Sequence, residues 1–257
     1  SFVGYHPAHV LITNIAPDHL DFYGSLDAIY EAFEEFARTA QKSIVLCADD
    51  AGTRELRGRL GGAAPVGTGG TAPEADVVMT ELSPGPRASF VVSAGGESTR
   101  VTLAVPGRLP ALNATGVVAL LVQLGFSLTE AGDAASGFEG ADRRFQYHGT
   151  LSGVSFYDDH AHHPTEVAAA LETARAVAGE GHVITLFQPH LFSRTKYMAA
   201  ELAEAFARGS DHTIFLDIFG SREDPIEGVT TALILDQLPS AASYDFEPDW
   251  DRACALA

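Results

Sequence analysis

Positive charge is scarce in this chain of 257 residues, which has 16 lysine and arginine residues against 34 aspartate and glutamate residues. The formal net charge of −18 argues against a nucleic-acid-binding protein, because binding to a phosphate backbone needs a basic face. Basic runs that would bind an anionic membrane are also absent. Lys42 and Lys196 are the only lysines. We therefore expect arginines, backbone amides or a metal ion to hold any anionic ligand.

Cysteine is nearly absent too. Cys47 and Cys254 allow neither a disulfide framework nor a zinc-finger spacing, and Cys47 ends an apolar run typical of a buried strand. The chain shows no charged-then-apolar signal pattern and no apolar run long enough to span a bilayer. These absences favour a reducing, cytoplasmic location. Because no initiator methionine is present, we expect a fragment of a longer protein.

The first part of the chain combines buried strands, amphipathic helices and a hairpin. Apolar residues recur at helical spacing after Ser25, which can cap that helix, and alternate with period two between residues 76 and 105. A later helix is apolar on nearly every side, which implies burial between layers. The expected strands are 10–13, 43–47, 88–93 and 99–105, and the expected helices begin after Ser25 and span 53–60, 111–124 and 128–135.

The second part alternates strands and helices with short connections, which favours a right-handed, mostly parallel sheet of the Rossmann type. The expected strands are 154–157, 182–187, 213–216 and 243–246, and the expected helices are 165–178, 196–208, 230–238 and one from residue 248 onward. We place the domain boundary near residue 141, giving domains 1–141 and 142–257. Neither GxGxxG nor GxxxxGK[ST] occurs, so the chain lacks both common phosphate-cradling glycine loops.

One stretch concentrates reactive side chains. Residues 157–166 (YDDHAHHPTE) hold two adjacent aspartates and three histidines between an expected strand and an expected helix. Open α/β sheets bind their ligands at the carboxyl ends of strands. A polar loop that merely happens to be rich in histidine is the plainer interpretation.

Four further clusters have both a functional and a plain interpretation. His19, between Asp18 and Asp21, is chemically suited to a divalent metal, or belongs to a capping turn. Asn113 can hydrogen-bond a base edge or cap a helix. Arg143 and Arg144 can clamp a phosphate or form a solvated surface pair. The fourth cluster, 187–195 (FQPHLFSRT), offers His190 and Arg194 to an anionic or zwitterionic ligand.

Taken in order, four of these segments resemble the Mur ligases: ITNIAPDHLD at 12–21, GADRRF at 140–145, DDHAHHPTE at 158–166 and FQPH at 187–190. The resemblance covers nearly the whole chain and is closest to the member that adds L-alanine to UDP-N-acetylmuramate. It implies an α/β fold in which the C-terminal part of the central ATPase domain (1–141) precedes a Rossmann-like C-terminal ligase domain (142–257), which is expected to be truncated at its end. The partners it implies are the two substrates and the missing upstream domains of the same enzyme.

The resemblance also implies a reaction and its residues. ATP would phosphorylate the muramoyl carboxylate with release of ADP, and the amine of L-alanine would attack the acyl phosphate and expel phosphate. Mg²⁺ and cationic groups would neutralise the phosphoryl group in transit. His19 would bind Mg²⁺, Asn113 adenine, Arg144 the nucleotide phosphates across the domain seam, and Asp159 the ribose. His163, His190 and Arg194 would be catalytic, facing the amino-acid and acyl-phosphate end, with His160 and His162 binding substrate.

Three departures from the family pattern accompany the resemblance. The phosphate loop with its lysine is expected upstream of Ser1. His160 stands where the family usually has tyrosine, and Leu109-Pro110 replaces the usual His-Asn before the Leu-Asn-Ala at 112–114. We therefore expect the isolated chain neither to ligate nor to hydrolyse ATP.

Three other functions stay open at this point. One is the ligase that recycles a murein tripeptide, although Gln188-Pro189-His190 favours the alanine-adding enzyme. Another is a non-catalytic ligase homologue that binds nucleotide or a partner. The third is a metal-dependent hydrolase using Asp159, His160, His162 and His163, which the helix start at Pro164 disfavours by suggesting that the histidines serve a turn.

Overall fold

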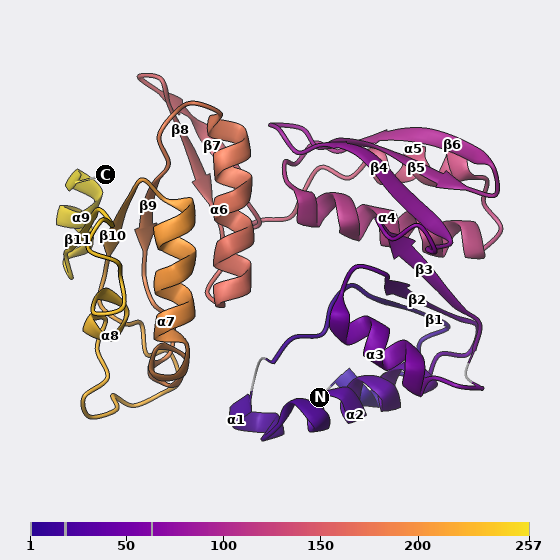
Figure 1. Cartoon of the computed structure of the whole chain (residues 1–257), viewed down its shortest axis with the longest axis horizontal. Helices are drawn as coiled ribbons and strands as arrows, with labels where there is room; N and C mark the ends of the chain where they lie inside the picture. The colour runs from indigo at the N-terminus through magenta and orange to yellow at the C-terminus, as the bar shows by residue number, and fades with distance from the viewer. Residues whose placement is uncertain (1, 18–19, 63, 257) are drawn as a thin grey trace. The chain divides into compact units, whose positions relative to one another are not determined.

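The computed structural model describes residues 2–17, 20–62 and 64–256, and the chain folds as two compact units, Ser1–Glu139 and Gly140–Ala257. The sequence patterns predict a boundary near residue 141, close to this division. Each unit has its own sheet and core, and we describe each by itself. The helices and strands are labelled in Figure 1.

Unit 1 is built on a six-stranded sheet in the order β1-β2-β3-β4-β5-β6. Strands β1 to β4 are parallel, whereas β4, β5 and β6 form an antiparallel meander. The strands are β1 (His9–Ile12), β2 (Ser43–Cys47), β3 (Val66–Gly70), β4 (Val77–Ser83), β5 (Ser89–Ala94) and β6 (Glu97–Thr102). The helices are the 3-10 helix η1 (Phe2–Gly4), α1 (Leu20–Tyr23), α2 (Leu26–Arg38), α3 (Ala51–Arg59), α4 (Arg108–Gln123) and α5 (Leu128–Ser136).

The central strand β2 shows why this sheet is covered on both faces. Successive strand side chains point to opposite faces, so Ile44 and Leu46 pack in the core formed with α2 and α3. Val45 points the other way, into the core formed with α4 and α5. All five residues of β2 are buried, as expected for a parallel strand between two helical layers.

Unit 2 contains a three-stranded parallel sheet, ordered β11-β10-β9, and a separate two-stranded hairpin of β7 and β8. The strands are β7 (Gln146–Leu151), β8 (Val154–Asp158), β9 (Ile184–Phe187), β10 (His212–Phe215) and β11 (Tyr244–Phe246). The helices are α6 (Pro164–Ala178), α7 (Phe192–Gly209), α8 (Ala232–Leu235) and α9 (Trp250–Leu256).

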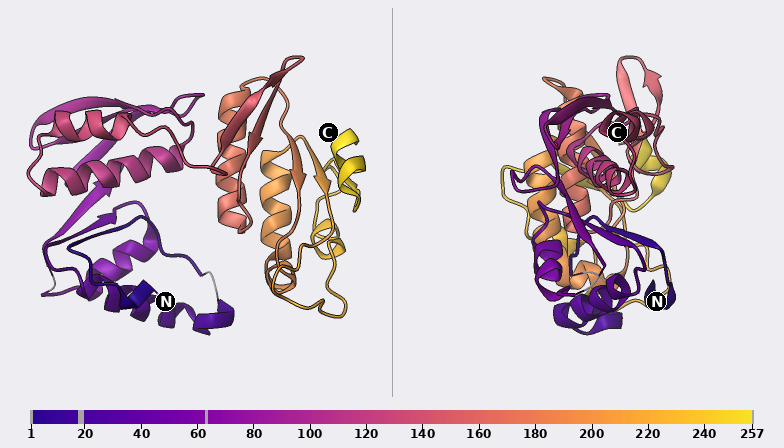
Figure 2. Two further views of the ribbon diagram at one scale, coloured as in Figure 1. Left: turned by 180° about the vertical axis from the view of Figure 1, so that it is seen from behind. Right: turned by 90° about the vertical axis from the view of Figure 1, so that its right-hand side faces the viewer.

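Helices α6 and α7 of unit 2 run side by side (Figure 2). Val167 and Leu171 of α6 share a buried cluster with Phe206 of α7 and Phe215 of β10. Ile214 and the buried Leu216 instead contact Ala253 of the terminal helix α9. The parallel sheet of this unit is therefore covered by α7 on one face and α9 on the other.

The α/β class and the mostly parallel pairing predicted from the sequence are confirmed. One pairing differs, since strand 154–157 was expected to continue the parallel sheet, whereas β8 pairs antiparallel with the unpredicted β7. The structure also adds β3 and shortens the expected helix 230–238 to Ala232–Leu235. None of the described helices is both long enough and apolar enough to cross a membrane.

Candidate functional site

The histidine-rich stretch forms the connection between β8 and α6, as its flanking patterns predict. Asp159 organises this connection. Its Oδ1 accepts the backbone N–H of Ala161 at 2.6 Å, and its Oδ2 accepts the N–H of Phe145 at 2.8 Å. The N–H of His160 donates to the carbonyl of Arg143 at 2.9 Å. The segment Arg143–Phe145 and the histidine loop are thus joined through backbone hydrogen bonds.

The joined segment carries backbone strain. Arg143 and Phe145 have φ values of 58° and 48°, a region that residues with a Cβ rarely occupy. Burial raises the pKa of the Asp159 carboxyl, more than its two amide donors and nearby Arg144 lower it. Burial therefore disfavours the charged form of Asp159 more than its hydrogen bonds and Arg144 favour it.

His163 begins helix α6. It occupies the N-cap position, where its Nδ1 accepts the N–H of Thr165 at 3.3 Å and Glu166 completes a capping box. Pro164 follows at the first helical position, a placement that suits a residue without an N–H. The His163 side chain is 9% exposed, and its buried Nε2 has no hydrogen-bond partner among the described residues. The structure gives His163 a structural task, and its catalytic role stays a prediction.

Glu166 stabilises the same turn. It accepts the backbone N–H groups of His162 and His163 at 3.3 and 3.4 Å, and its Oε1 lies 3.6 Å from Nη1 of Arg144. Burial alone would raise the pKa of Glu166, but these amides, the His162 ring and Arg144 together hold it below its usual value. No role was predicted for Glu166, although its place three residues after His163 is the spacing of a capping box.

Three histidines gather at the starts of α6 and α7. The ring centroid of His162 lies 4.9 Å from that of His160 and 5.5 Å from that of His190, which comes from the loop after β9. The structure therefore brings His190 next to His162, which lies 28 residues earlier in the sequence. His160 is exposed, whereas His162 and His190 are partly buried.

Hydrogen bonds assign the tautomers of two of these rings. Nδ1 of His162 lies 2.7 Å from the carbonyl oxygen of His160, so Nδ1 carries the proton and Nε2 is the acceptor. Nδ1 of His190 lies 3.2 Å from Nη1 of Arg194, which only donates, so Nε2 of neutral His190 carries the proton. The pair thus presents one acceptor nitrogen and one donor nitrogen.

Both rings favour the neutral form. Burial lowers the pKa of His162; the hydrogen bond to the His160 carbonyl opposes this effect, and the positive charge of Arg194 adds a smaller lowering. Burial also lowers the pKa of His190, with contributions from His162 and Arg194. A neutral imidazole at neutral pH can accept a proton, as a general base must.

Two predicted arginines have different surroundings. Arg194 is 8% exposed and donates from Nη1 to the carbonyl of His190 at 3.2 Å as well as to its ring. The Arg144 side chain is 59% exposed, with its guanidinium near Glu166. Arg194 is therefore fixed against His190, whereas Arg144 keeps a solvent-facing guanidinium suited to an anionic ligand.

The residues predicted in unit 1 are described separately. Asn113 is an exposed residue within the first two turns of α4. This helix begins after the N-cap residue Gly107, which provides no side-chain hydrogen bond to its first N–H groups. His19 lies outside the described residues. The loop that leads toward it is tied down, because Oδ1 of Asp50 accepts the N–H groups of Ile15 and Thr53 at 3.1 and 2.8 Å.

The clustered histidines do not form a metal centre. In the described parts of the chain, no group of three or more histidine, cysteine, aspartate or glutamate side chains is arranged to hold a metal ion. The ring of His163 caps α6, and both oxygens of Asp159 accept backbone amides. The structure therefore gives the hydrolase alternative no support, and it provides no described ligand set for Mg²⁺.

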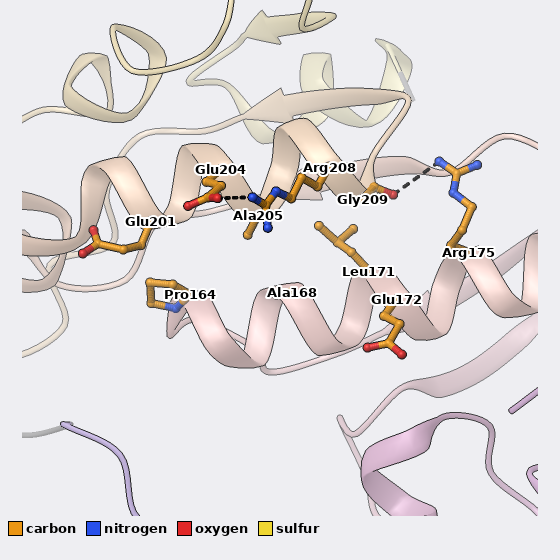
Figure 3. Close-up of a pocket in the computed structure, with 10 residues that line it drawn as sticks. All are labelled: Pro164, Ala168, Leu171, Glu172, Arg175, Glu201, Glu204, Ala205, Arg208 and Gly209. Atoms are coloured by element: carbon orange, nitrogen blue, oxygen red, sulfur yellow. Dashed lines mark hydrogen bonds and ion pairs between the residues drawn. The ribbon is translucent and has the colours of Figure 1, made fainter. Parts of the chain in front are cut away.

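A separate groove in unit 2 has none of these histidines in its lining. It has a volume of about 460 Å³ and lies between α6 and α7, with Leu171 and Ala205 among its apolar lining (Figure 3). Three of its charged side chains are already engaged, since Arg208 pairs with Glu204 at 2.5 Å and Arg175 donates to Gly209 and Asp211. We place the candidate site at the histidine cluster, because the rings of His162 and His190 lie side by side there and Arg194 donates to His190.

Comparisons with known proteins agree across the chain. A family model described as "Mur ligase middle domain" matches residues 2–121, and one described as "Mur ligase, glutamate ligase domain" matches residues 143–257. The UDP-N-acetylmuramate–L-alanine ligase of Clavibacter sepedonicus is 47% identical over 257 residues, which are 100% of this chain and 54% of that protein. The chain thus spans about half the length of the curated relatives it matches.

Solved structures show the same fold. The UDP-N-acetylmuramate-alanine ligase of Thermotoga maritima has a TM-score of 0.75 at 27% identity, covering 96% of this chain and 52% of that one. The MurF ligase of Thermotoga maritima, solved in complex with ADP, also has a TM-score of 0.75, at 16% identity, covering 97% and 55%. Fold similarity alone therefore does not distinguish between these two ligases.

Proposed function

Because the chain belongs to the Mur ligase family, we propose that it acts within an ATP-dependent ligase that joins L-alanine to UDP-N-acetylmuramate in peptidoglycan precursor synthesis. The observation that carries this proposal is the 47% identity to a UDP-N-acetylmuramate–L-alanine ligase across every residue of the chain. The histidine and arginine cluster in unit 2 supports it with suitable chemistry.

ATP, when bound, supplies the phosphoryl group that turns the muramoyl carboxylate into an electrophile. We propose that His190 and Arg194 bind the carboxylate of the incoming amino acid, through Nε2–H and the guanidinium. Neutral His162 then accepts a proton from the ammonium group of the amino acid through Nε2, so that the freed lone pair can attack the acyl phosphate and expel phosphate. These tasks follow from the tautomers that the hydrogen bonds assign.

Fewer observed contacts support the roles proposed for nucleotide binding than those proposed for amino-acid binding. We propose that the exposed guanidinium of Arg144 binds the nucleotide phosphates and that Asn113 recognises adenine. Asp159 would meet the ribose with lone pairs not used by its two amide donors. His19 is the proposed Mg²⁺ ligand, and the described residues contain no further group of side chains arranged to hold the ion.

A chimera tests the proposal. Residues 1–257 would replace the matching segment of the Clavibacter sepedonicus ligase, and release of ADP would be followed with each substrate omitted in turn. We expect turnover that requires both L-alanine and UDP-N-acetylmuramate. A chimera that turns over only with a murein tripeptide would overturn the assignment in favour of the recycling ligase, and an inactive chimera beside an active parent would count against a catalytic role.

Two variants of α7 sharpen this assay. Arg194→Ala should lower kcat/KM for L-alanine by about 10- to 100-fold, the loss expected for a charge-assisted hydrogen bond. Arg208→Ala is the matched control, because its exposed side chain pairs with Glu204 on the same helix. Equal losses in both variants would contradict a specific role for Arg194.

The isolated chain of 257 residues should show no ATP hydrolysis at a meaningful rate, because its sequence contains no phosphate-cradling glycine loop. A sensitive phosphate-release assay on the purified chain checks this expectation. Turnover that disappears in Arg144→Ala would contradict it, since that result would locate a working nucleotide site within these residues.

A further inference from the structure

The beginning of α7 is held by a segment that follows β10. We define this segment, residues 217–223, as the clamp. The N–H of Leu191 donates to the carbonyl of Phe219 at 3.0 Å, and the N–H of Phe219 donates to the carbonyl of Pro189 at 2.8 Å. These two hydrogen bonds lie on either side of His190. The backbone that carries His190 is therefore fixed by residues almost 30 positions later in the chain.

Helix α7 lacks a cap of its own. Its N-cap residue is the buried Leu191, which has a φ of 73° and no side chain able to accept a hydrogen bond. A leucine in this left-handed region is strained, and the first N–H groups of a helix need acceptors. The start of α7 is thus unfavourable unless another residue stabilises it.

Glu223 provides the missing cap from the clamp. Its Oε2 accepts the N–H of Ser193 at 2.9 Å, and its Oε1 accepts the Ser193 hydroxyl at 2.5 Å. Burial alone would raise the pKa of Glu223, but Ser193 and the N–H of Phe192 together hold it below its usual value. Glu223 is therefore ionised at neutral pH, and a negative charge at a helix N-terminus is stabilising because of the helix dipole.

The first turn that Glu223 caps is also the turn that carries Arg194. The guanidinium of Arg194 reaches back to the ring and the carbonyl of His190 at 3.2 Å, so the geometry of this pair depends on how α7 begins. We propose that Glu223 is a positioning residue, which holds His190 and Arg194 in the arrangement that binds the carboxylate of the acceptor amino acid. This role rests on the proposed function, since it deepens the amino-acid end of that site.

The hydrogen bonds of the clamp can be tested in the chain of 257 residues by a measurement that requires no catalytic activity. Hydrogen exchange at the amides of residues 191–195 would be compared between the native chain, Glu223→Ala and Glu223→Gln. Asp224→Asn is the matched control, because Asp224 is an exposed acidic neighbour in the same loop. We expect faster exchange in Glu223→Ala, a smaller change in Glu223→Gln, whose amide oxygen still accepts, and none in the control. Unchanged exchange in Glu223→Ala would overturn the clamp.

The positioning role is tested in the chimera described above. Glu223→Ala should raise KM for L-alanine by about tenfold or more, the effect of losing a capping hydrogen bond to a charged group, with KM for ATP unchanged. Glu223→Gln should restore part of the loss. A parallel rise of both KM values, or an unchanged KM for L-alanine, would overturn the role. An inactive chimera with native Glu223 would refute the proposed function instead, while hydrogen exchange would still decide the clamp.

Discussion

Asp159 offers a direct test of how the histidine loop is held together. Replacing it with alanine removes both acceptors of the N–H groups of Phe145 and Ala161. A donor left without a partner costs about 1–3 kcal/mol, and both sites are only partly buried, so we expect a loss of about 2–3 kcal/mol in all. Asp159→Asn keeps one acceptor oxygen and should lose about half of this.

The assay uses the only tryptophan of the chain. Trp250 lies in α9 of unit 2, so its fluorescence during a urea titration reports the unfolding of that unit. The expected loss moves the urea midpoint of Asp159→Ala down by about 1–2 M, for an m-value near 1.5–2 kcal/mol/M. Asp158→Asn is the control, because the Asp158 side chain is 50% exposed. A shift no greater than that of the control would refute the role of Asp159.

The pH dependence gives a second and independent check. Burial raises the pKa of Asp159, so the folded state binds its proton more readily than the unfolded state. The stability that wild type gains from this group is greatest below the unfolded pKa of about 3.9 and falls as the pH rises through the folded pKa. The advantage of wild type over Asp159→Asn should therefore shrink between pH 4 and pH 7. An advantage that grows with pH would show that the amide donors and Arg144 outweigh burial.

Three further predictions follow from single contacts. A Cβ on Gly209 would lie 2.5 Å from Cβ of Leu171, so Gly209→Ala should force α6 and α7 apart and lower the free energy of unfolding of unit 2 by about 1–3 kcal/mol in the Trp250 titration. Removing the N-cap of α2 by Ser25→Ala should cost about 1 kcal/mol, measured from hydrogen exchange within that helix. Burial lowers the pKa of His162 and of His190, so both rings stay neutral as the pH falls to the usual histidine pKa of about 6.5. The acid limb of the pH profile of kcat/KM in the chimera should therefore be centred below about pH 6.5. A limb above that value would exclude His162 as the base.

Periodic patterns predicted the elements whose neighbours are close in sequence. Strand β2 and helix α2, with its Ser25 cap, occur where the sequence indicates them. Strand β7 was missed because Gly149 interrupts it and its polar residues do not alternate clearly, and its partner β8 was assigned to the wrong sheet. A strand followed by a helix is typical of a parallel sheet, but the preceding hairpin partner decides the pairing.

The candidate site also contains contacts that local sequence patterns do not predict. His163 stands out in the sequence, and Pro164 directly after it predicts a helix start, which the structure confirms. Glu223 had no local signal, since a glutamate in a polar loop is normally solvated. Its importance comes from a helix start 30 residues earlier that cannot cap itself. Contacts of this kind depend on tertiary structure and leave no spacing to recognise.

The two helix starts explain why His162 and His190 meet. Helices α6 and α7 pack along their length through Leu171, Leu202 and Phe206, so the loops that precede them emerge at neighbouring positions. Each loop needs a cap for its helix, and each receives a glutamate, Glu166 for α6 and Glu223 for α7. Because His163 with Glu166 caps α6 and Glu223 caps α7, neither cap uses a ring nitrogen of His162 or His190. The capping of both helices is therefore what leaves a neutral donor and a neutral acceptor available for an amino acid.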